Sequence, residues 1–164
     1  MIRKAEIDDA SRIAEIQISG WRYAYKGIID DIILFRKLNI EKKSQMIRET
    51  LREGKEEWFV YEENGIIKGM MIISKSRDEE KSDCFELCAI YVEPLMIRNG
   101  IGKKMLEYFE ETGKNRGFKE YIVWVLEKNI IGRSFYEKNG YKPDGKKLEI
   151  EKLNAVEIRY CKKI

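Results

Sequence analysis

The sequence predicts an α/β fold in which helices flank a mixed, mostly antiparallel sheet. Three observations support this prediction. Short apolar runs of strand character alternate with longer segments of helical periodicity. An Asn-Gly dipeptide at 64–65 separates two of the apolar runs, as in a tight antiparallel hairpin. A later run is followed by a glycine turn, a helical segment and another apolar run, which is typical of a crossover between parallel strands.

Length and composition limit the possible classes of protein. A chain of 164 residues is of the size at which one core forms, so we expect a single domain over residues 1–164. Hydrophobic residues make up 43% and charged residues 37%, which excludes disorder, and no apolar run is long enough to span a bilayer. Charges of both signs are interspersed and the net charge is +3, so no nucleic-acid partner is expected. The first residues show no apolar export segment, and we expect a cytoplasmic protein.

Residue types that are missing narrow the chemistry. Histidine is absent, and the three cysteines do not have the spacing of metal ligands. The sequence therefore predicts no metal site and excludes Ser-His-Asp and Cys-His nucleophile pairs. Any proton transfer must use a carboxylate, tyrosine, lysine, cysteine or water.

The N-terminal part predicts one strand followed by two helices. Residues 2–7 have strand character, and an aspartate directly after them can cap a helix that ends near Gly20. Segment 21–27 is aromatic and basic, and residues 39–53 resume helical spacing.

The middle of the chain predicts three strands. Residues 58–61 and 66–74 flank the Asn-Gly dipeptide at 64–65. Asn and Gly both tolerate the positive φ that a tight hairpin turn requires. Residues 84–92 are apolar enough for a central strand, and Pro94 ends it.

The C-terminal part predicts two helices and three strands. A helix with an apolar stripe is expected over residues 100–116, followed by a strand at 121–126. A short helix opens at Asn129, and two closing strands are expected at about 141–150 and 156–162. The full order is β-α-α-β-β-β-α-β-α-β-β.

A glycine turn between the strand at 84–92 and the next helix has the form of an anion site. Gly100 and Gly102 open the helix, where the first backbone amides lack partners and the helix dipole favours negative charge. Taken alone, this turn fits phosphate binding and close packing equally well. A P-loop is excluded because Lys103 is followed by Lys104, and the dinucleotide fingerprint is excluded because Met105 stands where its third glycine belongs.

These residues resemble the acyl-CoA motif of the GNAT-type N-acetyltransferases. Residues 90–94 and 97–102 resemble its Val-x-Pro and Gln/Arg-x-x-Gly-x-Gly/Ala segments, with Ile97 in the place of Gln or Arg. Residues 129–141 are similar to the family's Asn-x-x-Ala-x-x-Phe-Tyr-x-x-x-Gly-Phe segment, and residues 19–27 to a stretch between its first two helices. The resemblance spans essentially the whole chain.

The resemblance implies direct transfer of an acetyl group from acetyl-CoA to a primary amine of a small molecule or peptide. Backbone groups of the central strand would bind the pantetheine arm, and the glycine turn would bind the pyrophosphate. The implied cofactor-binding residues are Ile90, Tyr91, Val92, Ile97, Arg98, Asn99, Gly100, Ile101, Gly102, Lys103, Asn129, Arg133 and Tyr136. The alternative is a catalytically weak module of the same fold that binds or senses acyl-CoA, for which Ile97 is mild support.

Two residues are the candidates for proton transfer. By resemblance Tyr136 would protonate the departing thiolate, and a packing role beside Phe135 is the alternative. Glu86 is the candidate base, because it lies in an apolar strand where burial raises a carboxyl pKa, and an edge-facing, solvated glutamate is the alternative. Trp21 and Tyr25 are candidates for binding the amine substrate, and core anchoring is the alternative for Trp21. A homodimer is possible from family habit.

Overall fold

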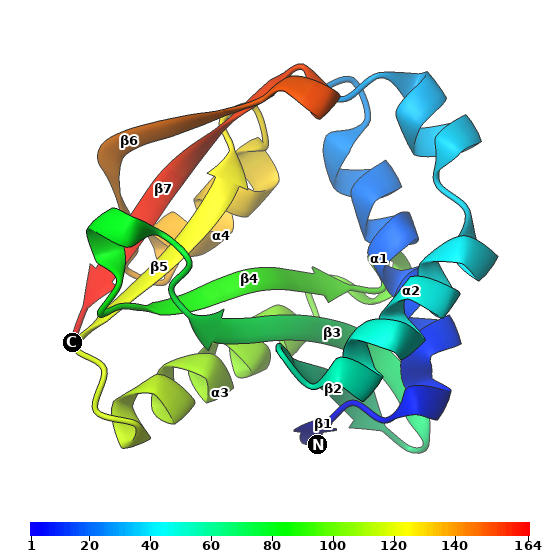
Figure 1. Cartoon of the computed structure of the whole chain (residues 1–164), viewed down its shortest axis with the longest axis horizontal. Coiled ribbons are helices and arrows are strands. Elements are labelled where there is room, and N and C mark those ends of the chain that lie inside the picture. The colour runs from blue at the N-terminus through cyan, green and yellow to red at the C-terminus, as the bar shows by residue number, and fades with distance from the viewer.

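The computed structural model describes residues 1–164 and forms one seven-stranded sheet in the order β1-β2-β3-β4-β5-β7-β6 (Figure 1). The strands are β1 (Ile2–Lys4), β2 (Glu57–Glu63), β3 (Ile66–Lys75), β4 (Phe85–Val92), β5 (Glu120–Leu126), β6 (Lys142–Ile150) and β7 (Ala155–Lys163). The helices are α1 (Ala10–Tyr25), α2 (Ile40–Glu53), α3 (Ile101–Asn115) and α4 (Ile130–Lys138). Only β4 and β5 pair in parallel, so the mixed, mostly antiparallel sheet is confirmed.

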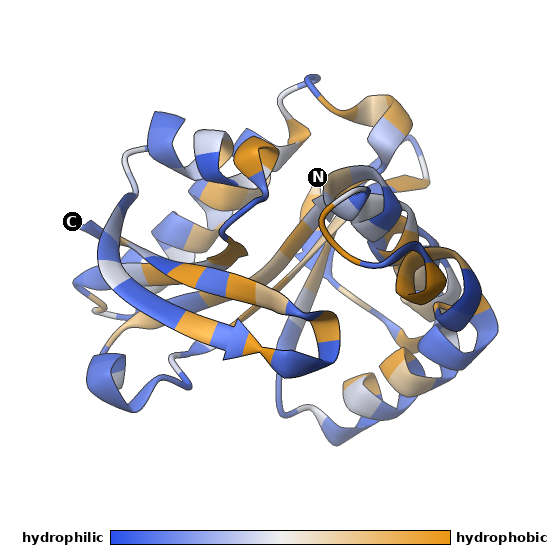
Figure 2. Ribbon diagram, turned by 90° about the horizontal axis from the view of Figure 1, so that it is seen from above, coloured by the Kyte–Doolittle hydropathy of each residue, from blue (hydrophilic) through white to orange (hydrophobic).

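Helices cover both faces of the sheet, and each face has its own apolar cluster. Helices α1 and α2 pack on one face, where Ile13 and Ile47 meet Val60 of β2. Helix α3 packs on the other face, where Phe109 stacks on Phe85 with ring centroids 4.9 Å apart. Figure 2 shows the strand β7 alternating between hydrophobic and hydrophilic residues, and β6 as a mostly hydrophilic edge. No helix has the length and apolar character needed to cross a membrane.

The hairpin between β2 and β3 is confirmed. Asn64 and Gly65 have φ of 54° and 73°, the left-handed backbone that a two-residue antiparallel turn requires. Asn and Gly are the residues that adopt this conformation at least cost, so the local sequence determines this turn.

The first helix is longer than the sequence predicts. It continues past Gly20 to Tyr25, and a Cβ at Gly20 would lie 2.7 Å from Cδ1 of Tyr91. Gly20 is therefore a point of close approach between α1 and β4 instead of a helix end. The first strand is shorter than expected, since a 3-10 turn at Ile7–Asp9 follows β1.

The sheet opens between its two parallel strands. Residues 85–87 of β4 pair with residues 121–123 of β5, and beyond this point the two strands diverge, as Figure 1 shows. On the other side of β4, Ile72 pairs with Ala89 and Ile73 with Leu87, which leaves Cys88 in a bulge. Bulges bend a strand and increase its twist. The bulge at Cys88 therefore lies where β4 turns away from β5.

Candidate active site

A cavity of about 730 Å³ occupies the opening between β4 and β5. Its walls come from these two strands, the C-terminal part of α1, the segment that leads into α3, α4 and one residue of β7. Most of the cofactor-binding residues implied by the sequence line it: Ile90, Tyr91, Val92, Ile97, Arg98, Gly100, Ile101, Gly102, Lys103, Asn129 and Tyr136. A cavity of this size accepts a cofactor or a drug-sized ligand.

The segment before α3 presents backbone amides to this cavity. Arg98 and Gly100 have φ of 67° and 77°, and the first hydrogen bond of the helix runs from the Lys104 N–H to the Gly100 carbonyl. The amides of residues 101–103 therefore have no acceptor within the helix, and no acidic side chain stands in the first turn. Together with the helix dipole, these donors make a site for an anionic group such as a pyrophosphate.

Tight packing does not explain why residue 102 is glycine. A Cβ built there would lie 3.5 Å from Phe135 and 3.8 Å from Val92, both ordinary contact distances. The space therefore accepts alanine, in agreement with the Gly/Ala alternative of the resembling motif. Of the two interpretations of this glycine turn, close packing and phosphate binding, the packing one loses its support at this position.

Gly100→Ala is expected to weaken acetyl-CoA binding and to lower the free energy of unfolding by about 1–2 kcal/mol, because an L-residue is strained at φ of 77°. Gly102→Ala is the matched control for stability and should unfold within about 0.5 kcal/mol of the wild type. Urea unfolding and titration with acetyl-CoA measure both effects. Wild-type affinity for acetyl-CoA in Gly100→Ala would contradict the role of this backbone.

The free edge of β4 is the second backbone feature of the cavity. This strand pairs with β3 along its length, but with β5 only as far as Leu87. From Cys88 to Val92 its amide and carbonyl groups on the β5 side have no strand partner, and these residues line the cavity. An extended ligand arm can bind there as an added strand does.

Tyr136 on α4 lines the cavity. The side chain is 6% exposed, and its ring contacts the rings of Phe135 and Tyr141 with centroids 5.3 and 5.8 Å away. The hydroxyl makes no hydrogen bond within the protein, and burial raises the pKa of this phenol. Tyr136 is therefore protonated at neutral pH and packs against neighbouring rings, and its role as proton donor stays a prediction.

Asn129 and Arg133, both implied as cofactor ligands, have different positions. Oδ1 of Asn129 accepts the Gly132 N–H at 3.0 Å and caps α4, while the side chain still lines the cavity. Arg133 does not line the cavity, because its guanidinium donates to the Tyr160 hydroxyl at 3.1 Å and to the Glu127 carbonyl at 3.0 Å. Asn99 also lies outside the lining. The cofactor role of Arg133 and Asn99 stays a prediction that the lining of this cavity does not support.

Glu86 is buried as expected, but it is not a free base. It is 2% exposed, and Arg77 donates to it from Nη2 at 2.6 Å and from its backbone N–H at 2.9 Å. The carboxylate does not line the cavity. The segment between β3 and β4 folds back and places Arg77 against Glu86 of β4. The hydrophobic pattern of β4 alone does not predict this contact. The assignment of Glu86 as base is therefore corrected.

Glu157 on β7 is the carboxylate that lines the cavity, and the sequence reasoning missed it. It makes no ion pair or hydrogen bond, and burial raises the pKa of its carboxyl; the charge of Arg77 lowers this pKa to a lesser extent, and the charge of Glu86 raises it slightly. The signal was available in the alternation of Glu157, Arg159 and Cys161 with apolar residues along this strand. This alternation shows that the three residues share one face of the strand, but it does not show which part of the protein that face contacts.

Of the two aromatic substrate candidates, only Tyr25 lines the cavity. Its hydroxyl lies 3.0 Å from the hydroxyl of Tyr91. Trp21 packs edge-on against Tyr25, with centroids 5.3 Å apart, in a cluster with Ile29 and Leu34 outside the lining. This position agrees with core anchoring, the alternative for Trp21, and the substrate role of Tyr25 stays a prediction.

Comparison with known proteins agrees with this geometry. The model of the acetyltransferase (GNAT) family matches residues 24–141. A probable N-acetyltransferase of Mycobacterium tuberculosis is 28% identical over 161 residues, which cover 96% of this chain and 88% of that protein. A spermidine N(1)-acetyltransferase of Thermoplasma acidophilum is 26% identical over 155 residues, which cover 92% of this chain and 95% of that protein.

Solved structures show the same fold. PaiA N-acetyltransferase from Thermoplasma acidophilum, in complex with coenzyme A, has a TM-score of 0.74 at 23% identity and covers 100% of this chain and 98% of its own. The structure of yncA from Salmonella typhimurium with acetyl-CoA has a TM-score of 0.69 at 17% identity and covers 99% and 92%. The family match extends over most of the chain, and the cavity has the backbone donors that its cofactor needs. The chain belongs to the GNAT family of N-acetyltransferases, with acetyl-CoA as its acyl donor.

Proposed function

We propose that this protein transfers the acetyl group of acetyl-CoA directly to the primary amine of a small molecule or peptide. The observation that supports this most is the composition of one cavity, which contains an anion-binding backbone, a protonated phenol and an unpaired carboxylate. Acetyl-CoA supplies the activated acetyl group as a thioester. The protein supplies position and the movement of two protons.

The donor is held chiefly by backbone. The amides of residues 101–103 bind the pyrophosphate, and the free edge of β4 binds the pantetheine arm. Ile97 supplies no charge, so Arg98 and Lys103, which also line the cavity, provide the positive potential.

Glu157 and Tyr136 are the two groups that transfer protons in this reaction. An alkylammonium has a pKa of about 10.4 and must lose a proton before its nitrogen can attack. Glu157 accepts that proton, because its raised pKa makes it a stronger base than an exposed glutamate. When the C–N bond has formed and the C–S bond breaks, Tyr136 donates its phenolic proton to the departing sulfur, since its raised pKa keeps it protonated, and the second proton of the attacking nitrogen restores the phenol. The anionic Glu157 and the ring of Tyr25 also suit a cationic acceptor.

Spermidine and lysine side chains are the first acceptors to examine. Spermidine is the substrate in the printed name of the Thermoplasma relative. A relative from Escherichia coli, 24% identical over 142 residues, is named a peptidyl-lysine N-acetyltransferase. Both names describe primary alkylamines, the class that an anionic, aromatic cavity favours. The acyl-CoA sensor is the second candidate, and Ile97 is the residue that favours it.

Thermal shift with acetyl-CoA, CoA, ATP and NAD tests donor binding. Acetyl-CoA and CoA should raise the Tm, because a ligand at a hundred times its Kd adds about 2.7 kcal/mol to the stability of the folded state. ATP and NAD should have no comparable effect. A protein that responds to neither CoA species contradicts the proposal.

Thiol release then separates the enzyme from the sensor. Spermidine, lysine peptides, aminoglycosides and free amino acids are offered with saturating acetyl-CoA. Release that depends on one amine supports the transferase. Binding of acetyl-CoA with no release across all amines supports the sensor instead.

A further inference from the structure

Arg159 on β7 is 5% exposed, which is unusual for a charged side chain. Its Nε donates to Asp144 at 2.7 Å, and its Nη1 donates to Asp78 at 2.5 Å and to Glu80 at 3.4 Å. Asp144 belongs to β6, whereas Asp78 and Glu80 belong to the segment between β3 and β4. One buried guanidinium therefore joins β6, β7 and that segment.

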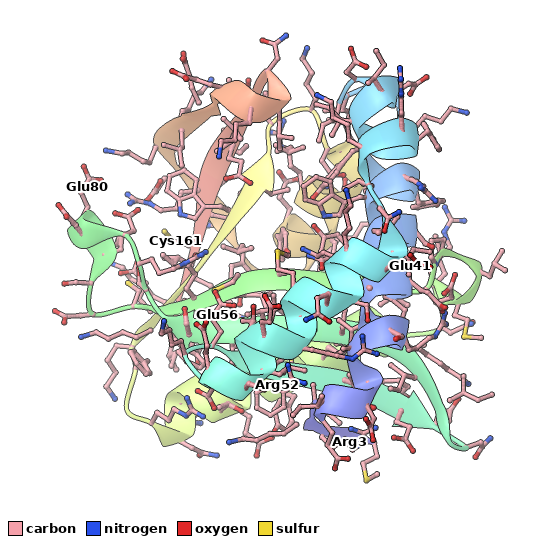
Figure 3. The ribbon with its side chains drawn as sticks, turned by 45° about the vertical axis from the view of Figure 1, so that its right-hand side comes forward. Arg3, Glu41, Arg52, Glu56, Glu80 and Cys161 are labelled. Atoms are coloured by element: carbon pink, nitrogen blue, oxygen red, sulfur yellow. The ribbon has the colours of Figure 1, made fainter.

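Residues 76–83, which we call the strap, connect β3 to β4 and contact both β4 and β7. Arg77 of the strap binds Glu86 on β4, and the next residue, Asp78, binds Arg159 on β7. Strand β5 lies between β4 and β7, so the strap passes over β5. Figure 3 shows Glu80 of the strap on the same side of the molecule as Cys161 of β7.

A bulge in β6 supplies one of the carboxylates. Pro143 pairs with Tyr160 and Lys147 pairs with Ile158, so residues 144–146 stand opposite Arg159 alone. Gly145 in this bulge has φ of 91°, a backbone that glycine adopts without strain. The bulge thus brings the Asp144 carboxylate to Arg159.

Two residues of the cavity wall adjoin Arg159. Its guanidinium carbon lies 5.7 Å from the centroid of the Trp124 ring, and Trp124 lines the cavity. Glu157, which also lines the cavity, precedes Arg159 by two residues and so shares its face of β7. Arg159 itself does not reach the cavity.

We propose that Arg159 is a positioning residue for the acceptor amine: by holding the strap across β5 it fixes Trp124 and Glu157 at the opening between β4 and β5. This inference rests on the proposed acetyl transfer. The contacts with Asp78 and Asp144 use two different edges of one planar guanidinium, and its face lies against an aromatic ring. Lysine cannot make that combination, because its ammonium is a single point charge.

Arg159→Lys is the test variant, and Lys146→Gln is its matched control. Lys146 binds Glu80 at 2.5 Å and joins the same two elements, β6 and the strap, but this ion pair is exposed and uses Oε1 of Glu80, whereas Arg159 contacts Oε2. In Arg159→Lys the KM for spermidine should rise about tenfold, as for a group displaced by a fraction of an ångström, while the KM for acetyl-CoA stays unchanged. Lys146→Gln should leave both KM values unchanged. An equal rise of both KM values in Arg159→Lys would overturn the proposal, because a merely structural role has that effect.

Quenching of Trp124 fluorescence by acrylamide decides the question independently of turnover. The signal is the difference between each protein and the same protein with Trp124→Phe. Stronger quenching in Arg159→Lys than in the wild type or Lys146→Gln supports the proposal, and equal quenching overturns it. If Arg159→Lys does not fold, Asp144→Asn replaces it, with the same directions expected. A wild type that acetylates no amine counts against the proposed function, whereas the quenching result still decides the role of Arg159.

Discussion

Replacing Glu157 with glutamine is expected to lower kcat/KM for the amine by about 10²-fold at neutral pH, since a positioned general base contributes typically that much or more. Glutamine keeps the size of the side chain and cannot accept the proton of an ammonium. Because Glu157 has no ion pair or hydrogen bond, the substitution leaves no partner unsatisfied. Initial rates of thiol release with spermidine at several pH values measure the effect.

The matched control is Glu86→Gln, which makes the same chemical change at the other buried carboxylate. Its charge is already paired with Arg77 and it lies outside the cavity, so the rate should stay close to that of the wild type. The free energy of unfolding should fall by about 1 kcal/mol, a modest figure because Arg77 is largely exposed. A large loss of rate in Glu86→Gln, with none in Glu157→Gln, would make Glu86 the base after all.

The pH dependence gives Glu157 a second signature. Burial raises the pKa of its carboxyl in the folded protein, and a base acts only when deprotonated. The acid limb of kcat/KM should therefore lie at higher pH than for an exposed glutamate, and should disappear in Glu157→Gln. The ionised form that is needed for catalysis has the opposite effect on folding stability. A folded pKa above the unfolded value means that ionised Glu157 destabilises the fold, so Glu157→Gln should raise the Tm at neutral pH and lose that gain in acid.

Tyr136→Phe is expected to lower kcat by about 10²-fold, because the thiolate then leaves without a positioned proton donor. The ring keeps its contacts with Phe135 and Tyr141, and the missing hydroxyl had no partner within the protein. Stability and acetyl-CoA affinity should therefore stay close to those of the wild type. Steady-state kinetics, thermal unfolding and acetyl-CoA titration measure the three quantities.

Tyr141→Phe is the matched control for this prediction. Tyr141 lies beside Tyr136, but its hydroxyl donates to Glu110 at 3.1 Å and it does not line the cavity. Its removal should cost about 1 kcal/mol of stability and leave kcat unchanged. Equal kcat values in Tyr136→Phe and the wild type would assign the proton to water and Tyr136 to packing.

The features predicted correctly from sequence are those that depend on nearby residues. The Asn64-Gly65 turn follows from the backbone freedom of two residues, and the order of helices and strands follows from hydrophobic periodicity. The glycine turn before α3 is also local, because free amides and a dipole belong to any helix start. The family and its cofactor could therefore be predicted from the sequence.

The features predicted wrongly depend on contacts between distant segments. Glycine is typical of a helix end, yet α1 continues through Gly20, where the missing side chain leaves room for Tyr91 of β4. The position of Arg133 also depends on a distant partner, since Tyr160 of β7 binds its guanidinium outside the cavity, and its cofactor role stays a prediction. In both cases the deciding partner lies tens of residues away along the chain.

The roles of the two buried glutamates show the same division. The sequence by itself determined the fold class, and it predicted the donor-binding backbone and Tyr136 as a candidate, since each depends on a short, continuous segment. Only the tertiary structure decided which carboxylate meets the cavity. Glu86 was the better candidate by its apolar strand, but the strap folds back and pairs it with Arg77, whereas the register of β5 and β7 brings Glu157 to the opening without a partner. Strand pairing and the folding back of a loop bring together residues that are far apart in sequence. A local sequence pattern therefore does not predict which charged residue of a distant segment will pair with a buried carboxylate.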